Sequence, residues 1–167
     1  WISGEASRAD VQRWRARSCA ILTGIGTVLA DDPALTARLP GVGLQPLRVV
    51  ADTRWRTPPN SRIVQNPAAA LLAGSRERTI PAALAETGAE CLPLPEVAGR
   101  VDLHALLRAL AVREINEIQV EAGAGLCGAL LMASLVDEIV LYQAPVLLGK
   151  GGPGLFNLAV IESMRDR

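Results

Sequence analysis

The sequence predicts an α/β domain with a mainly parallel central sheet and helices on both of its faces. Three observations support this prediction. Short apolar runs alternate with segments of helical periodicity, most of these runs are continuously apolar, and 167 residues suit a single domain with an ordinary core. Parallel strands are covered on both faces, so continuous apolar runs indicate parallel rather than antiparallel pairing.

The elements follow in chain order. A helix is expected from about residue 6 to 17, and Pro33 should end a short helical turn that begins near Ile25. The clearest helix covers residues 102–113, where leucines recur at i, i+3, i+4 and i+7 and Asp102 can act as N-cap. Further helices are expected at 80–86 and 126–135, with surface loops at 40–45 and 54–66. The predicted strands are residues 19–23, 47–52, 69–73, 90–94, 117–121 and 138–144.

Composition excludes several classes of function. Seventeen basic side chains balance seventeen acidic ones and aromatic residues make up 3%, so a nucleic-acid-binding surface is not expected. The three cysteines form no C-x-x-C pair, which argues against a disulfide framework or zinc site and favours a reducing cytoplasm. The longest uncharged run, between Glu121 and Asp137, is too short to span a bilayer.

A glycine pattern follows the predicted strand at 117–121. Gly123, Gly125 and Gly128 spell G-x-G-x-x-G between that strand and a predicted helix, where backbone N–H groups can meet a phosphate. The alternative is a tight turn whose small residues serve packing. The next predicted strand ends in L-Y-Q-A-P, without the acidic residue that holds the ribose of NAD. A 2′-phosphorylated cofactor, or another α/β fold with a similar cradle, therefore stays open.

Other candidates are few. The single histidine, His104, falls off the apolar stripe of its helix and should face solvent, which leaves no histidine for a triad or zinc site. Glu121 lies at the carboxyl end of a strand, where ligands bind in open α/β sheets. Asp31 and Asp32 precede Pro33 and can be turn residues or the wall of a site.

The sequence resembles the reductase domain of the bifunctional riboflavin-biosynthesis deaminase/reductase over nearly its whole length, from Trp1 to about Leu158. The residues that carry the resemblance are W-I, D-V-Q-R-W-R-A-R-S, A-I-L-T-G-I-G-T-V-L-A-D-D-P-A-L-T-A-R, P-L-R-V-V-A-D-T, V-E-A-G-A-G-L-C-G-A-L-L and L-V-D-E-I-V-L-Y-Q-A-P-V-L-L-G. The D-D-P-x-L-T-x-R block is far more specific than the glycine pattern. The resemblance implies a dihydrofolate-reductase-like fold.

The resemblance also implies a reaction: NADPH-dependent reduction of 5-amino-6-(5-phosphoribosylamino)uracil to its ribitylamino form. Asp31 and Glu121 are the implied candidates for orienting sugar hydroxyls or assisting proton transfer. Implied substrate contacts are Arg15, Leu35, Arg38 and Glu121, the two arginines being suited to a ribose phosphate. Implied cofactor contacts are Trp1, Thr27, Asp31, Thr53, Gly123, Ala124, Gly125, Leu126, Cys127, Gly128 and Ala129. Arg54, or Ser75 and Arg76, are candidates for the cofactor's 2′-phosphate by position only.

The same resemblance bears on the alternative functions and on the extent of the domain. A reductase of this fold could instead act on a diaminopyrimidinone ribosyl phosphate or a pterin, and a non-catalytic domain could keep the fold. Residues 1–167 are expected to form one reductase domain that lacks the family's strand before Trp1 and its terminal strands after Arg167. No H-x-E or P-C-x-x-C zinc signature of the family's deaminase occurs in these residues, although such a domain could be fused upstream in the native chain. A homodimer is expected for this family.

Overall fold

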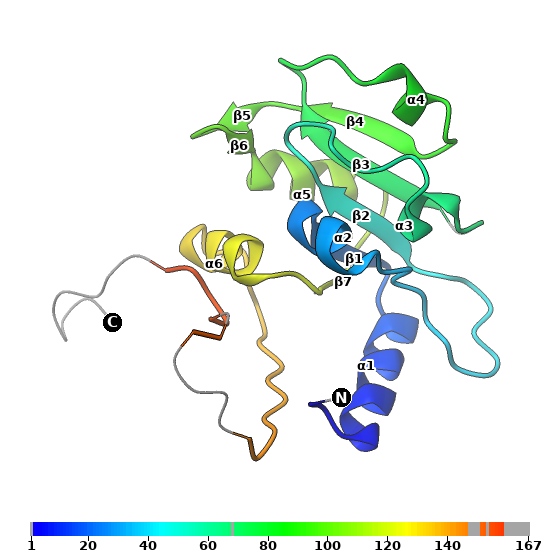
Figure 1. Ribbon diagram of the computed structural model, residues 1–167, viewed down its shortest axis with the longest axis vertical. Helices are drawn as coiled ribbons and strands as arrows, with labels where there is room; N and C mark the ends of the chain where they lie inside the picture. Colours follow the sequence, from blue (N-terminus) through cyan, green and yellow to red (C-terminus); the bar gives the residue numbers. More distant parts are fainter. Residues whose placement is uncertain (1, 68, 147–150, 153, 159–167) are drawn as a thin grey trace, which may run out of the picture.

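The computed structural model describes residues 2–67, 69–146, 151–152 and 154–158 of the chain. The described part contains a five-stranded sheet, a two-stranded hairpin and six helices (Figure 1). In chain order the elements are α1 (Glu5–Arg17), β1 (Ala20–Gly24), α2 (Ile25–Asp31), β2 (Leu47–Ala51), α3 (Arg62–Gln65), β3 (Ala70–Ser75), α4 (Ala82–Ala85), β4 (Glu90–Leu94), β5 (Glu96–Val97), β6 (Arg100–Val101), α5 (Leu103–Ala111), β7 (Ile118–Val120) and α6 (Ala124–Met132).

The five strands of the main sheet are all parallel, in the order β4-β3-β2-β1-β7. Ala20 of β1 is in register with Leu47 of β2 on one side and with Ile118 of β7 on the other. β1 therefore joins an early and a late part of the chain. Because the strands are parallel, the loops that follow β1, β2 and β7 lie at one edge of the sheet, where ligands bind in such folds.

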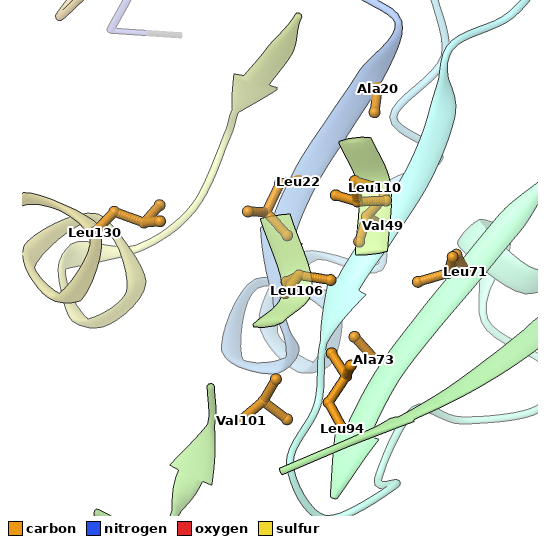
Figure 2. Close-up of a cluster of buried hydrophobic side chains, with 10 residues drawn as sticks. All are labelled: Ala20, Leu22, Val49, Leu71, Ala73, Leu94, Val101, Leu106, Leu110 and Leu130. Atoms are coloured by element: carbon orange, nitrogen blue, oxygen red, sulfur yellow. The ribbon is translucent and has the colours of Figure 1, made fainter. Parts of the chain in front are cut away.

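Two hydrophobic clusters cover the two faces of this sheet. Successive residues of a strand point to opposite faces, so Leu22 belongs to the cluster under α5 and α6, and Ile21 to the cluster under α2, α3 and α4. Figure 2 shows the first cluster, in which Leu106 and Leu110 of α5 and Leu130 of α6 pack with side chains from the sheet. Both faces of the central strands are thus buried, which explains why these strands are largely apolar. Thr23, Arg48 and Ser75 are polar residues of these strands that are nevertheless fully buried.

The predicted α/β class is confirmed, and most elements lie where the sequence places them. Five of the six predicted strands are present, with ends that shift by one or two residues. Asp102 is the N-cap of α5, because its Oδ1 accepts a hydrogen bond from the backbone N–H of Ala105 at 3.1 Å. His104 is exposed, as its place off the leucine stripe predicts. The expected loop at 54–66 contains one short helix, α3.

The predicted strand at residues 138–144 is wrong, because this segment forms no strand and runs away from the sheet (Figure 1). Ile139 and Leu141 are 55% and 60% exposed. The segment contacts α1 instead, where the hydroxyl of Tyr142 donates to Asp10 Oδ2 at 2.7 Å. Burial, together with this hydrogen bond, raises the pKa of Tyr142 to about 12. An apolar run becomes a strand only when a neighbouring backbone accepts its hydrogen bonds.

The antiparallel hairpin of β5 and β6 was not predicted from the sequence. Its two-residue turn consists of Ala98 and Gly99, whose φ angles of 50° and 73° are both in the left-handed region that a tight hairpin turn requires. Alanine at the first turn position is a weak signal, since asparagine, aspartate or glycine is preferred there. The backbone N–H of Val101 donates to Thr53 Oγ1 at 3.0 Å, and this bond holds the hairpin against the loop after β2.

The structure also bears on membrane spans, metal sites and disulfides, which the composition argues against. Within the part of the chain that the structure describes, no helix is both long and apolar enough to cross a membrane. Among the same residues, no group of three or more histidine, cysteine, aspartate or glutamate side chains is placed to hold a metal ion. Cys19, Cys91 and Cys127 are free cysteines, and only Cys19 is exposed.

Candidate functional site

Two neighbouring cavities lie at the carboxyl ends of β1, β2 and β7, and they share Thr27, Asp31 and Gly123 as lining residues. The first cavity has a volume of about 480 Å³ and the second about 720 Å³. The first is lined by Arg15, Thr27, Asp31, Pro33, Leu35, Glu121, Ala122 and Gly123. The second is lined by residues from the loops after β1 and β2, from the β5–β6 hairpin and from the first turns of α6.

An ion pair between Arg15 and Glu121 forms one wall of the first cavity. Arg15 Nε donates to Glu121 Oε1 and Arg15 Nη2 to Oε2, both at 2.6 Å, so the contact is bidentate. Arg15 Nη1 also donates to the carbonyl of Thr36 at 3.0 Å. The two side chains are 12% and 24% exposed, so the pair is mostly shielded from water. The guanidinium and carboxylate are therefore fixed relative to one another before any ligand binds.

Glu121 is held by further hydrogen bonds from the sheet. Its backbone N–H donates to the carbonyl of Leu22 at 2.9 Å, and the buried hydroxyl of Thr23 donates to its carbonyl at 2.7 Å. Gln119 Nε2 donates to Glu121 Oε1 at 3.0 Å. Residues two apart in a strand share one face, which is why Gln119 can reach this carboxylate. The carboxylate of Glu121 is thus oriented both by Arg15 and by Gln119.

The two carboxylates of the D-D-P segment, Asp31 and Asp32, have different surroundings. Asp31 is exposed at the last position of α2 and lines both cavities. Asp32 ends the helix in a left-handed conformation (φ 41°), and its Oδ1 accepts from the backbone N–H of Arg62 at 2.8 Å. Asp32 is therefore a turn residue that holds backbone, which is one of the two alternatives that the sequence leaves open for this segment. Leu35 is 4% exposed in the first cavity and also has a positive φ of 47°, which is uncommon for a non-glycine residue.

The three glycines of the G-x-G-x-x-G pattern also differ in their surroundings. A Cβ at Gly123 or Gly125 would meet nothing within 4 Å, and both residues line the second cavity. A Cβ at Gly128 would lie 2.2 Å from the carbonyl oxygen of Asn157, whose N–H donates to the carbonyl of Ala124 at 2.9 Å. Gly128 is therefore required by packing, whereas no residue that the structure describes comes close enough to require glycine at the other two positions. The first turn of α6 also leaves N–H groups without acceptors inside the helix.

The remaining predicted site residues are distributed as follows. Thr53, Ala124, Leu126 and Ala129 line the second cavity together with Gly123 and Gly125. Arg38 lines neither cavity; its side chain is exposed, and its backbone N–H donates to Gln12 Oε1 at 2.7 Å. Trp1 lies outside the described residues.

Cys127 and Gly128 also lie outside the linings of both cavities. The thiol of Cys127 donates to the carbonyl of Ala122 at 3.3 Å. Burial raises the pKa of this thiol above its usual value, so it stays protonated near neutral pH. Among the predicted 2′-phosphate candidates, Arg54 lines the second cavity, while Ser75 is fully buried and Arg76 is exposed outside both cavities.

Sequence reasoning missed four residues that the structure brings to these cavities. Gln119 and Thr23 fix Glu121, and Arg56 and Arg100 line the second cavity. The i, i+2 spacing of Gln119 and Glu121 on a predicted strand was a usable signal. Arg100 could not be placed without the hairpin that carries it.

Comparison with known proteins gives consistent results. The family model of the RibD C-terminal domain matches residues 1–166. The riboflavin biosynthesis protein RibD of Escherichia coli (strain K12) is 43% identical over 180 aligned residues, which cover 99% of this chain and 48% of that protein. A 2,5-diamino-6-ribosylamino-4(3H)-pyrimidinone 5′-phosphate reductase of Archaeoglobus fulgidus is 40% identical, and the match covers 89% of this chain and 71% of that protein.

A solved structure agrees with these matches. Acinetobacter baumannii RibD superposes with a TM-score of 0.87 at 38% identity, over 100% of this chain and 46% of that one. The dihydrofolate-reductase-like fold expected from the sequence is thereby confirmed. This chain spans about half the length of the RibD relatives that it matches. The chain belongs to the RibD C-terminal domain family.

Proposed function

We propose that this chain is an NADPH-dependent reductase domain of riboflavin biosynthesis that converts 5-amino-6-(5-phosphoribosylamino)uracil to 5-amino-6-(5-phosphoribitylamino)uracil. The observation that carries the proposal is the pair of cavities that share Thr27, Asp31 and Gly123. One cavity offers a glycine-lined helix N-terminus and the other an oriented guanidinium–carboxylate pair. This arrangement suits a dinucleotide in the second cavity and a small polar substrate in the first.

The second cavity has the features that a dinucleotide requires. Gly123 and Gly125 leave open space where any other residue would place a Cβ, so a ligand can approach the backbone closely. The N-terminus of α6 favours negative charge through its free N–H groups and its helix dipole. A volume of about 720 Å³ lies within the usual range for cofactor sites. Residues 123–126 and Thr53 would hold NADPH, which when bound supplies the hydride.

The proposed reaction needs one hydride and one proton. The furanose ring of the substrate opens as the proton of the bridging nitrogen moves to the ring oxygen, which leaves an open-chain imine. Addition of hydride to C1′ and of a proton to the imine nitrogen then gives the ribitylamino product. Asp31 borders both cavities, and Glu121 is the oriented carboxylate of the first, so these two are the candidates for orienting sugar hydroxyls or delivering the proton.

The residues proposed to bind the substrate would have different roles. Leu35 presents an apolar surface to the first cavity, while Arg15 holds Glu121 in place through two hydrogen bonds of 2.6 Å. Three of the N–H donors of Arg15 are already engaged, so its main contribution would be to orient Glu121. Arg38 stays a candidate for the ribose phosphate, from a position outside the cavity.

A second candidate substrate is the diaminopyrimidinone ribosyl phosphate, because the Archaeoglobus relative is named for it and the match covers 71% of that protein. The two substrates differ at C2 of the pyrimidine, which carries a carbonyl in one and an amino group in the other. A deaminase domain elsewhere in the native protein would favour the uracil, since the deaminated base is then supplied directly. We propose such a fusion, a homodimeric assembly and a cytoplasmic location.

Oxidation of NADPH by the full-length protein tests the proposal. The phosphoribosylaminouracil should be reduced with the highest kcat/KM, the diaminopyrimidinone analogue more slowly, and the unphosphorylated and pterin analogues least. Faster reduction of the diaminopyrimidinone would move the assignment to the second candidate. Binding of NADPH without turnover of any of these compounds would contradict the reductase function, and absence of NADPH binding would indicate a non-catalytic domain.

A further inference from the structure

We propose that Gln45 is a positioning residue for the substrate, because its side-chain amide holds the backbone that carries Leu35 at the wall of the first cavity. The proposal rests on the proposed function, since it assumes that the first cavity holds the substrate. Gln45 lines neither cavity and would act only through the backbone of Ala37. Leu35, which lines the first cavity, precedes Ala37 by two residues.

The side chain of Gln45 contacts Ala37 through two hydrogen bonds. The backbone N–H of Ala37 donates to Gln45 Oε1, and Gln45 Nε2 donates to the carbonyl of Ala37, both at 2.9 Å. A side-chain amide carries an acceptor and a donor side by side, so one glutamine can bind both backbone groups of one residue. Ala37 is 5% exposed, so its backbone groups depend on this partner more than on water.

The two neighbours of Ala37 in the chain are also held by side chains. Arg15 Nη1 donates to the carbonyl of Thr36 at 3.0 Å, and the backbone N–H of Arg38 donates to Gln12 Oε1 at 2.7 Å. These three consecutive residues belong to no helix or strand, and among the described residues they form no hydrogen bond to another backbone group. Side chains from α1 and from Gln45 therefore define the path of this segment.

Leu35 needs such support because of its backbone conformation. Its φ of 47° lies in the left-handed region, where a residue with a Cβ stays only if the surrounding structure holds it. The side chain is 4% exposed and packs in the cluster that also contains Val28 and Ile63. Packing thus fixes the side chain of Leu35, and the hydrogen bonds to the residues that follow fix the direction in which the chain leaves it.

Gln45 can act as a fixed point because it is joined to the central sheet. The next residue, Pro46, is buried, and β2 begins at Leu47, whose backbone N–H donates to the carbonyl of Cys19 at 3.0 Å. Proline fixes its own φ and restricts the residue before it, so the backbone of Gln45 has few alternative conformations. The amide of Gln45 therefore connects the segment behind the first cavity to the sheet.

The loop that separates this segment from Gln45 gives no comparable support. Leu44 is 89% exposed, and a Cβ at Gly41 or Gly43 would meet no described residue within 4 Å. A loop with so few buried contacts moves easily unless its ends are held. Removal of the amide of Gln45 should therefore loosen the backbone after Leu35 without disturbing the core.

Steady-state kinetics and NADPH titration of the full-length protein test the proposal. Gln45→Met keeps the length of the side chain and removes both hydrogen bonds to Ala37. The KM of the phosphoribosylaminouracil should rise by about 5-fold, as expected for the net loss of about one hydrogen bond. Because Arg15 and Gln119 still orient Glu121 in this variant, kcat and NADPH affinity should stay near their wild-type values.

Gln45→Glu makes the contact with Ala37 depend on pH. A protonated carboxyl has an acceptor and a donor side by side, as the amide does, whereas a carboxylate only accepts and would repel the carbonyl of Ala37. The KM of this variant, divided by the wild-type KM at the same pH, should therefore fall as the pH is lowered from about 8 to about 5, towards the pKa range of a glutamate. The same ratio for Gln45→Met should not change with pH.

Gln65→Met is a matched control. Gln65 is also exposed, and its Nε2 donates to the carbonyl of Pro59 at 2.8 Å, but it lies outside both cavities. Its replacement should leave KM, kcat and NADPH affinity unchanged. Hydrogen exchange measured by mass spectrometry should be faster at residues 35–38 in Gln45→Met than in the wild-type protein or in Gln65→Met, because the N–H of Ala37 loses its acceptor.

The possible outcomes separate this proposal from the proposed function. Faster exchange at residues 35–38 with an unchanged KM would overturn the proposal alone, and so would a parallel loss of substrate and NADPH affinity. A KM of Gln45→Glu that is raised equally at every pH would also contradict it. A wild-type protein that binds NADPH but reduces none of the candidate substrates would overturn the proposed function, and the role of Gln45 with it.

Discussion

The two cavities hold their charged groups in opposite states. In the first, the guanidinium of Arg15 and the carboxylate of Glu121 neutralise each other through a bidentate contact at 2.6 Å that is largely shielded from solvent. In the second, a helix N-terminus and three exposed arginines face the cavity, and none of the three is paired with a carboxylate in the described part of the chain. Positive charge is balanced internally in one cavity and left for a ligand in the other.

This difference indicates whether substitutions in each cavity should mainly change ligand affinity or the rate of the chemical step. An anion that enters the second cavity supplies the missing negative charge, so affinity there should depend on charge and on salt. In the first cavity the charges of Arg15 and Glu121 already compensate each other, so removing one leaves the other unpaired in a shielded place, which is costly. Substitutions there should affect the chemical step more than they affect binding of the cofactor.

The largest effect is expected for Glu121→Gln. This change removes the carboxylate that Arg15 and Gln119 orient, so kcat/KM should fall by about 100-fold or more, with most of the loss in kcat if Glu121 assists proton transfer. Steady-state kinetics and NADPH titration measure the two parts, and NADPH affinity should stay near the wild-type value. Loss of substrate affinity with full turnover would rule out a role in proton transfer.

The neighbouring Glu117 offers a matched control for that substitution. Glu117 also pairs with an arginine, Arg17, at 2.7 Å, but these side chains are 37% and 60% exposed. Exposed pairs of this kind contribute about 1 kcal/mol or less to stability. Glu117→Gln should therefore leave kcat, KM and NADPH affinity unchanged.

The next effect separates Gly125, which lines the second cavity, from Gly128, which packs against Asn157. Gly125→Ala meets no protein atom, so the domain should fold normally, while NADPH binding weakens by about 10-fold because the new methyl group occupies ligand space. Gly128→Ala places a Cβ 2.2 Å from the Asn157 carbonyl oxygen and should lower the free energy of unfolding by about 1–3 kcal/mol. Thermal denaturation and NADPH titration of both variants check this. The reverse pattern would show that the two glycines exchange roles.

A smaller effect is expected for Gln119→Met, which keeps the length of the side chain but removes the hydrogen bond to Glu121 Oε1. Loss of one such bond should reduce kcat/KM by about 5-fold. In a double-mutant cycle, the same change on the Glu121→Gln background should have almost no further effect. Additive losses in kcat/KM would mean that Gln119 does not act through Glu121.

The smallest effect is expected for Arg38→Ala, because this side chain is exposed and outside both cavities. A solvent-exposed contact with the ribose phosphate should raise the KM of the phosphorylated substrate by about 3-fold and leave NADPH affinity unchanged. Measuring KM for phosphorylated and unphosphorylated substrates isolates the contribution of the phosphate. A KM effect that is equal for both substrates would remove Arg38 from the phosphate site.

Local sequence patterns were sufficient for most of the fold. Buried parallel strands such as β3 have apolar residues on both faces, with Leu71 in one cluster and Leu72 in the other. The leucine stripe and the Asp102 cap of α5 are encoded within one helix. The segment at 138–144 has the same apolar character, yet it contacts α1 through Tyr142 instead of joining the sheet. Pairing depends on which strand edge is available, and no local pattern encodes that.

The candidate site was predicted less completely than the fold. Glu121 was placed correctly at a strand end, since parallel strands gather their carboxyl ends at one edge. Its contact with Arg15 joins residues 106 positions apart, and only the folded sheet brings them together. Arg100 depends on a hairpin whose turn begins with alanine. The position of residues at strand ends was sufficient to predict a ligand site at this edge of the sheet. Which charged side chains pair with each other could be seen only in the three-dimensional structure.

The place of β7 beside β1 has a consequence for the order in which this domain matures. The strands from β1 to β4 and the helices between them are complete before residues 118–132 leave the ribosome, because synthesis proceeds from the N-terminus. Both cavities, however, require Gly123, and the first also requires Glu121. We therefore expect a nascent chain to form a sheet that cannot yet bind either ligand, and to gain both binding sites in a single late docking step of β7 and α6.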